Sequence, residues 1–198
     1  MDREKGLKET FIAREGLKLI IPSLVLSILF YIFFYYTLAV LSLLFFFFCL
    51  FFFRNPKRSS NEPIDRLISP ADGKVTEIKE VMENDFLGYE ATRVSIFMSL
   101  ASVHVNRAPM AGRIARVEHR PGKFALAWKT DVEKENERNY ILISGNDEKI
   151  LVVQVAGFLA RRITSYVHKD DEVNRCEPLG IIAFGSRVDI YFPKSYEC

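Results

Sequence analysis

The sequence predicts a mainly β fold (β-rich α+β), an antiparallel sandwich or partly open barrel, preceded by two apolar helices. From about residue 64 onward, apolar and polar residues alternate in short runs separated by Gly, Pro and Asn, which is typical of strands joined by turns. Before that, the run from Leu19 to Phe53 contains no charged residue, and nine of the 17 phenylalanines lie between Phe33 and Phe53. A chain of 198 residues cannot bury so much Phe in its own core, so this run is expected to lie in lipid.

The apolar run is expected to form a membrane hairpin. One helical pass needs about 20 residues, so the run fits two short passes, residues 19–36 and 38–53; a single long tilted helix is the alternative. The run is longer than the apolar core of a secretory signal peptide, and it lacks a small-residue cleavage site. Residues 1–18 form an amphipathic segment of mixed charge. Lys and Arg flank both ends of the run, which predicts that both ends lie on the cytoplasmic side.

The rest of the chain divides into a linker and one domain. Residues 54–63 are polar and carry two prolines, as in a linker, and residues 64–198 are expected to form the β-rich domain. One helix is expected within it, at Phe158–Val167, where apolar residues recur at helical spacing. Strands are expected at residues 73–80, 92–98, 113–117, 140–143, 150–155 and 188–192.

Charge and cysteine content exclude several classes of protein. The formal net charge is +2, and no basic stripe is interleaved with aromatic residues, so nucleic-acid binding is not expected. The three cysteines, Cys49, Cys176 and Cys198, are odd in number and have no metal-ligand spacing. Neither a disulfide framework nor a bound metal is therefore expected, and the domain suits a reducing, cytoplasmic setting.

The stretch Ile181–Pro193 carries the clearest chemical signal. Gly185 and Ser186 interrupt an apolar pattern that otherwise reads as strand. Glycine leaves its carbonyl unshielded by a Cβ, and the next residue brings a hydroxyl, so Ser186 Oγ could attack the peptide bond before it. The alternative interpretation is a β-bulge between two halves of one strand.

Two further segments supply polar groups. Asp72 and Gly73 form a turn before a strand, which needs no function to explain it. His104 and Asn106 follow another strand and have the same parity, so an extended backbone would project both to one side. His119 and His168 sit in charged surroundings and are expected to be solvated. Together, Ser186, His104 and Asp72 could act as nucleophile, base and orienting group.

The segments Ser69–Val75, Phe97–Gly112, Gln154–Ile163 and Phe184–Pro193 together resemble the short, membrane-associated form of phosphatidylserine decarboxylase, including archaeal archaetidylserine decarboxylases. The resemblance implies a proenzyme that cleaves itself between Gly185 and Ser186 into chains of residues 1–185 and 186–198. Residue 186 would become a covalent pyruvoyl group, which forms a Schiff base with the serine headgroup of a phospholipid and accepts electrons as carbon dioxide leaves.

The resemblance also implies roles for individual residues. His104 would act as the acid or base and Asp72 would orient it. Longer relatives have a second histidine where this chain has Arg107, so His104 would serve both self-cleavage and decarboxylation, or another base serves one step. Arg107 and Asn106 are candidates for substrate binding, because a guanidinium suits carboxylate or phosphate. A structural ion pair is the alternative interpretation of Arg107.

The implied partners are a serine phospholipid, the cell membrane and the chain's own cleavage products, which form a heterodimer. The sequence leaves open whether the lipid is ester- or ether-linked and whether cleaved units assemble further. Rival interpretations are an uncleaved, membrane-anchored β-barrel binding or scaffold module, and a lipid hydrolase that uses Ser186.

Overall fold

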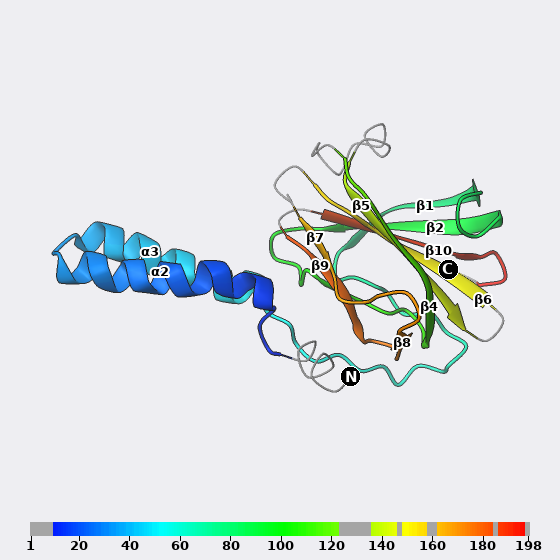
Figure 1. Cartoon of the computed structure of the whole chain (residues 1–198), viewed down its shortest axis with the longest axis horizontal. Helices are drawn as coiled ribbons and strands as arrows, with labels where there is room; N and C mark the ends of the chain where they lie inside the picture. The colour runs from blue at the N-terminus through cyan, green and yellow to red at the C-terminus, as the bar shows by residue number, and fades with distance from the viewer. Residues whose placement is uncertain (1–9, 123–135, 146–147, 158–161, 184–185, 197–198) are drawn as a thin grey trace. The chain divides into compact units, whose positions relative to one another are not determined.

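The computed structural model describes residues 10–122, 136–145, 148–157, 162–183 and 186–196. The chain forms two compact units, Met1–Lys57 and Arg58–Cys198. The first unit is helical and the second is built of strands (Figure 1).

The first unit is a helical hairpin of α2 (Arg14–Ile32) and α3 (Tyr36–Phe52). The turn lies at residues 33–35, a few residues earlier than the sequence pattern indicates. The Ser27 hydroxyl of α2 donates to the Ala39 carbonyl of α3 at 2.9 Å, and an antiparallel bridge between Ile12 and Arg54 joins the two ends. Many large apolar side chains of both helices are exposed. By length and composition α2 can cross a membrane, whereas α3 is apolar but shorter.

Seven strands of the second unit form one antiparallel sheet in the order β1-β2-β10-β6-β5-β4-β8. They are β1 (Lys74–Glu83), β2 (Tyr89–Met98), β4 (Gly112–Arg120), β5 (Arg138–Gly145), β6 (Glu148–Val155), β8 (Glu172–Val173) and β10 (Ser186–Pro193). All six predicted strands are present, and β8 is additional. In the part of the chain that the structure describes, β1 and β8 are opposite edges, so the sheet is open. The predicted β-rich antiparallel class is therefore confirmed.

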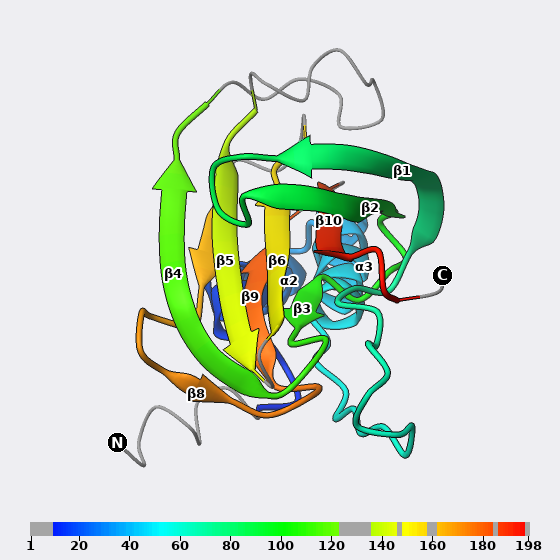
Figure 2. The same cartoon turned by 90° about the vertical axis from the view of Figure 1, so that its right-hand side faces the viewer.

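A second sheet of three short strands packs on one face of the first (Figure 2). Its order is β3 (Val105–Arg107), β9 (Pro178–Ile182) and β7 (Ile163–Ser165). Alternate side chains of the large sheet, among them Ile141, Val152 and Val188, form the core together with Leu179 and Ile182 of β9. The domain is thus a two-layer sandwich.

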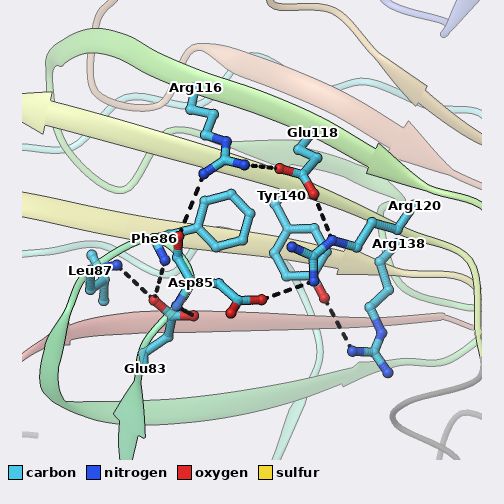
Figure 3. Close-up of polar contacts among 9 residues, drawn as sticks. All are labelled: Glu83, Asp85, Phe86, Leu87, Arg116, Glu118, Arg120, Arg138 and Tyr140. Atoms are coloured by element: carbon cyan, nitrogen blue, oxygen red, sulfur yellow. Dashed lines mark hydrogen bonds and ion pairs between the residues drawn. The ribbon is translucent and has the colours of Figure 1, made fainter.

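The turn of the β1–β2 hairpin folds over the opposite face of the large sheet (Figure 3). Phe86 stacks on Tyr140 of β5 with ring centroids 4.8 Å apart. The Glu83 carboxylate accepts backbone N–H bonds from Phe86 and Leu87, at 2.9 and 2.7 Å, and this fixes the turn. The Arg116 guanidinium of β4 lies 4.5 Å from the Phe86 ring centroid. Aromatic stacking and cation–π contacts therefore hold the hairpin in place and cover this face.

Two expectations need correction. The predicted helix at Phe158–Val167 is wrong where the structure describes it, because Ile163–Ser165 pairs with β9 as strand β7; residues 158–161 lie outside the described residues. Burial of Ile163 against β9 outweighs the local helical spacing. The stretch Ile181–Pro193 is also not one interrupted strand. β9 ends at Ile182 in the small sheet, and β10 begins at Ser186 in the large one.

Candidate functional site

Ser186 is the first residue of β10, the strand that lies between β2 and β6. It pairs in register with Met98 of β2, is fully buried, and directs its Oγ at the Met98 sulfur, 3.9 Å away. Its side chain lies on the face of the large sheet that packs against the small sheet, because Val188 and Ile190, of the same parity, belong to that core. Gly185 lies outside the described residues. Ile182 ends a strand of the small sheet and Ser186 begins a strand of the large one, so the chain changes sheets between these two residues.

A row of buried amides leads to the same methionine. Asn139 Nδ2 donates to Gln154 Oε1 at 2.9 Å, Gln154 Nε2 donates to Asn106 Oδ1 at 2.8 Å, and Asn106 Nδ2 donates to the Met98 sulfur at 3.3 Å. The three amide side chains are at most 1% exposed. The sequence singled out Asn106, and the structure places it inside the domain. Gln154 and Asn139 were missed, although each is a polar residue within an apolar strand, a pattern that could have drawn attention to them.

His104 lies next to the chain that enters the proposed cleavage site. Its backbone carbonyl accepts the N–H of Ile182, the last residue of β9, at 3.3 Å, and its side chain is fully buried. The ring Nδ1 lies 2.9 Å from the Ser102 carbonyl. A carbonyl can only accept, so Nδ1 carries the proton and Nε2 carries the lone pair that can take one up. His119 and His168 have side chains that are 47% and 77% exposed, as their charged surroundings predict.

Asp72 has a different partner from the one expected. Among the described residues, its carboxylate pairs with Arg58 at 2.6 Å and not with His104; both side chains of the pair are nearly half exposed. The group that orients His104 Nδ1 in this structure is the Ser102 carbonyl. Asp72 and His104 are thus in the same domain but are not joined by a hydrogen bond.

Asp72, Arg58 and Arg107 line a cavity of about 240 Å³, together with the residues Ser59, Ser60, Ser69, Val105 and Cys176. Arg107 is fixed by its backbone N–H to Pro70 O at 2.8 Å and by its guanidinium to Cys176 O at 2.9 Å. Burial, and next the nearby Arg58, lower the pKa of Arg107 from its ordinary value. With two guanidinium groups, one carboxylate and three serine hydroxyls, the cavity suits an anionic or zwitterionic ligand.

The other polar residues of the Phe184–Pro193 stretch lie on the opposite face of β10 from Ser186. Arg187 and Asp189 form a buried ion pair at 3.0 Å. Burial raises the pKa of Asp189, and the charge of Arg187 opposes the rise. Because strand residues alternate between faces, this pair does not share a face with Ser186. Its geometry fits a structural role in the second layer of the core.

Comparison with known proteins agrees with the geometry. The family model for phosphatidylserine decarboxylase matches residues 45–198. The chain is 42% identical over 188 residues to the phosphatidylserine decarboxylase proenzyme of Syntrophus aciditrophicus (strain SB), an alignment that covers 94% of this chain and 88% of that protein. It is 47% identical over 141 residues to the proenzyme of the same name from Carboxydothermus hydrogenoformans, covering 71% of this chain and 66% of that protein. The corresponding proenzyme of Magnetococcus marinus is 43% identical over 145 residues, with 73% and 66% covered. The chain therefore belongs to the phosphatidylserine decarboxylase family.

Proposed function

We propose that this protein is a self-processing, pyruvoyl-dependent decarboxylase that converts a serine phospholipid into the corresponding ethanolamine phospholipid. The observation that carries the proposal is the position of Ser186, a fully buried hydroxyl at the start of a central strand, directly after a crossing between sheets. Membership of the family and the word proenzyme in the names of its relatives support it. The function then requires a nucleophile, a base, a place for the headgroup and access to lipid.

The first step is an acyl shift at the bond between Gly185 and Ser186. Ser186 Oγ forms a bond to the Gly185 carbonyl carbon, its proton passes to a base, and the C–N bond breaks to leave an ester and a free amine. Removal of the Ser186 α-proton then expels the Gly185 carboxylate, and hydrolysis of the remaining enamine releases ammonia. The resulting pyruvoyl group supplies an electrophilic carbonyl that binds the substrate amine and accepts electrons as carbon dioxide leaves.

Strand pairing would keep the two proposed products together. β10 pairs with β2 from Ser186 to Pro193 and with β6 from Arg187 to Tyr191. Lys194 contacts Glu80 at 2.5 Å and Glu90 at 3.0 Å, which adds contacts beyond the strand. The short product would therefore remain as the central strand of the domain, a heterodimer made from one chain.

We assign His104 the acid and base role, because its Nδ1–H is fixed by Ser102 O and its Nε2 can take up a proton. Asp72 lines the cavity, where it pairs with Arg58. Since the Ser102 carbonyl already orients the imidazole, Asp72 is not needed for that task in the uncleaved protein. It provides a carboxylate for the substrate ammonium.

The cavity beside Arg107 is the proposed headgroup site. A serine phospholipid headgroup carries a phosphate and a carboxylate, both anionic, and one ammonium. Arg58 and Arg107 can meet the two anions and Asp72 the ammonium. Val105 and Arg107 of β3 face this cavity, whereas Asn106 between them faces Met98. β3 therefore connects the headgroup site with the reaction centre.

The helical hairpin is proposed to hold the domain at the cytoplasmic face of the cell membrane. Its exposed apolar side chains suit lipid, and Arg14, Lys18, Arg54 and Lys57 lie at the ends that are bridged together. A lipid substrate is confined to the bilayer, so a tether raises the concentration of headgroups that the site meets.

The first prediction concerns self-cleavage. Purified wild-type protein should give two masses, those of residues 1–185 and of a pyruvoyl-blocked 186–198, whereas Ser186→Ala should give one intact mass. His104→Ala should stall cleavage or leave a cleaved, inactive protein. A single intact wild-type chain would favour a scaffold module, or a lipid hydrolase if Ser186→Ala then abolished lipid hydrolysis.

The second prediction separates chemistry from stability at Asp72. The pair with Arg58 is nearly half exposed, so Asp72→Asn should lower the free energy of unfolding by less than about 1 kcal/mol. If Asp72 acts as proposed, decarboxylation should fall at least about tenfold. Urea unfolding and carbon dioxide release measure the two effects. Wild-type turnover by Asp72→Asn would remove the carboxylate from the mechanism.

The third prediction concerns the headgroup. Arg107→Lys keeps a positive charge but loses the forked donor, so KM for phosphatidylserine should rise about tenfold while self-cleavage continues. The matched control is Arg113→Lys, since Arg113 is an exposed cation of β4 that pairs with Asp170. Equal KM values for both variants and the wild type would argue against a headgroup at Arg107. The same assay with an ether-linked serine lipid tests whether the tails matter.

The fourth prediction concerns the tether. A chain that begins at Arg58 should cleave itself like the full chain, yet decarboxylate phosphatidylserine in vesicles at least about tenfold more slowly. Short-chain, water-soluble phosphatidylserine is the control, because the two proteins should act on it alike. Equal rates on vesicles would show that the hairpin does not deliver the domain to its substrate.

A further inference from the structure

The hydrogen bonds along the row of buried amides all run the same way, from donor to acceptor, toward Met98. The row consists of Asn139, Gln154 and Asn106. We propose that Asn139 and Gln154 are positioning residues that keep the N–H end of the Asn106 amide turned toward Ser186, where it stabilises negative charge during self-cleavage. This inference rests on the proposed function, because it assigns a role in the reaction of Ser186.

The direction follows from the contacts. Asn139 Nδ2 donates to Gln154 Oε1 at 2.9 Å, which leaves Gln154 Nε2 to face Asn106. Gln154 Nε2 donates to Asn106 Oδ1 at 2.8 Å, so the Nδ2 end of Asn106 must face the other way. It reaches the Met98 sulfur at 3.3 Å, the same atom that Ser186 Oγ approaches at 3.9 Å. An amide has a donor end and an acceptor end, so each link determines the next.

The backbone holds this row in place. Asn139 and Gln154 are directly paired across β5 and β6, and Asn106 pairs with Gly180 across β3 and β9. A Cβ on Gly180 would lie 3.0 Å from Gln154 Nε2 and 2.5 Å from Thr164 O. The absence of a side chain at Gly180 therefore leaves room for the Gln154 amide between the two sheets. The row joins the large sheet to the small one: Gln154 is opposite Val188 of β10, and Met98 at the end of the row is opposite Ser186.

The acceptor at the end of the row is weak. A thioether sulfur accepts hydrogen bonds poorly, so the Asn106 donor gives up little when it turns to a better acceptor. In the acyl shift, the bond from Ser186 Oγ to the Gly185 carbonyl carbon forms and the carbonyl oxygen becomes negative, until the C–N bond breaks and the nitrogen is protonated. A fixed donor in a buried site is worth most against such a charge. A reversed Asn106 would instead present Oδ1 and repel it.

The test reverses the donor-to-acceptor direction of the row by a substitution at Asn139, the end farthest from Met98. In Asn139→Asp the ionised carboxylate cannot donate to Gln154 Oε1. Gln154 would then turn to donate to the new carboxylate, Asn106 would turn to donate to Gln154, and Oδ1 of Asn106 would face Ser186. The matched control is Asn136→Asp, because Asn136 is also a buried amide, 4% exposed, whose Nδ2 donates at 2.9 Å. Its acceptor is the backbone carbonyl of Ala156, which cannot turn and pass the change on.

The full-length wild type and each variant are made by cell-free synthesis in detergent micelles. Mass spectrometry follows the appearance of the chain that ends at residue 185. The temperature is kept well below the melting points of the wild type and of both variants. Asn139→Asp should cleave about 10- to 100-fold more slowly than the wild type at a pH where the new carboxyl is ionised. The deficit should shrink on acidification, because a protonated carboxyl can donate again. Asn136→Asp should lose comparable thermal stability and cleave at the wild-type rate at each pH.

A second variant guards against misfolding of the first. Gln154→Glu offers acceptors on both sides, so it reverses Asn106 from the middle of the row, and it should show the same slow, acid-recovered cleavage. Wild-type cleavage rates in both Asn139→Asp and Gln154→Glu overturn the inference, as does slowing by Asn136→Asp to the same degree. A wild-type chain that never cleaves overturns the proposed function instead.

Discussion

The pairing of β10 on both of its edges is the constraint on which the rest of the domain depends. β10 contains the proposed nucleophile at its first position, and it fills the middle of the large sheet between β2 and β6. A central strand cannot be removed without exposing two rows of backbone hydrogen-bonding groups, each costly to bury unpaired. A cut before Ser186 therefore divides the chain without dividing the fold. The proposed reaction at Ser186 would need this, since its product must stay where the other residues act on it.

The two faces of β10 have different contacts, because successive side chains along a strand point to opposite faces. One face turns Ser186, Val188 and Ile190 toward the small sheet. The other buries Arg187 against Asp189, on the side that the β1–β2 hairpin covers. An ion pair on the same face as Ser186 would interact directly with any charge that develops at Ser186. On the opposite face, the backbone of β10 separates the ion pair from that charge. The ion pair of Arg187 and Asp189 and the charge that the proposed reaction would create are thus on opposite faces of β10.

Sequence patterns predicted the strands that are long enough to show alternating apolar and polar residues. They missed the short strands, which form only because they pair with other strands. The six predicted strands have at least eight residues in the structure, whereas the missed β3, β7, β8 and β9 have five or fewer and depend on partners far away in the chain. The false helix at Phe158–Val167 arose because apolar residues at helical spacing cannot reveal that Ile163 pairs with β9.

In the candidate site, too, some residues could be proposed from the sequence and others required the structure. Ser186 and His104 could be proposed from the sequence because each lies in a recognisable motif, whereas the Asp72–Arg58 pair depends on how the linker folds back. Gln154 and Asn139 could have been noticed as polar residues in apolar strands, but the sequence does not show that their side chains meet in the interior. A single polar residue in a strand normally points to water, and only the pairing of β5 with β6 turns both inward together.

The chemistry of the interior also explains why amides were needed there. An ionised group as deeply buried as Asn106 would need a paired counter-charge, and its own field would then dominate the site. An amide carries a dipole without a net charge, so three of them can be buried at the cost of satisfying their hydrogen bonds alone. The guanidinium groups that suit an anionic headgroup, Arg58 and Arg107, line a cavity on the other side of β3. In the proposed mechanism the headgroup would enter from this cavity, and the neutral interior would face the charge that develops on the backbone during self-cleavage.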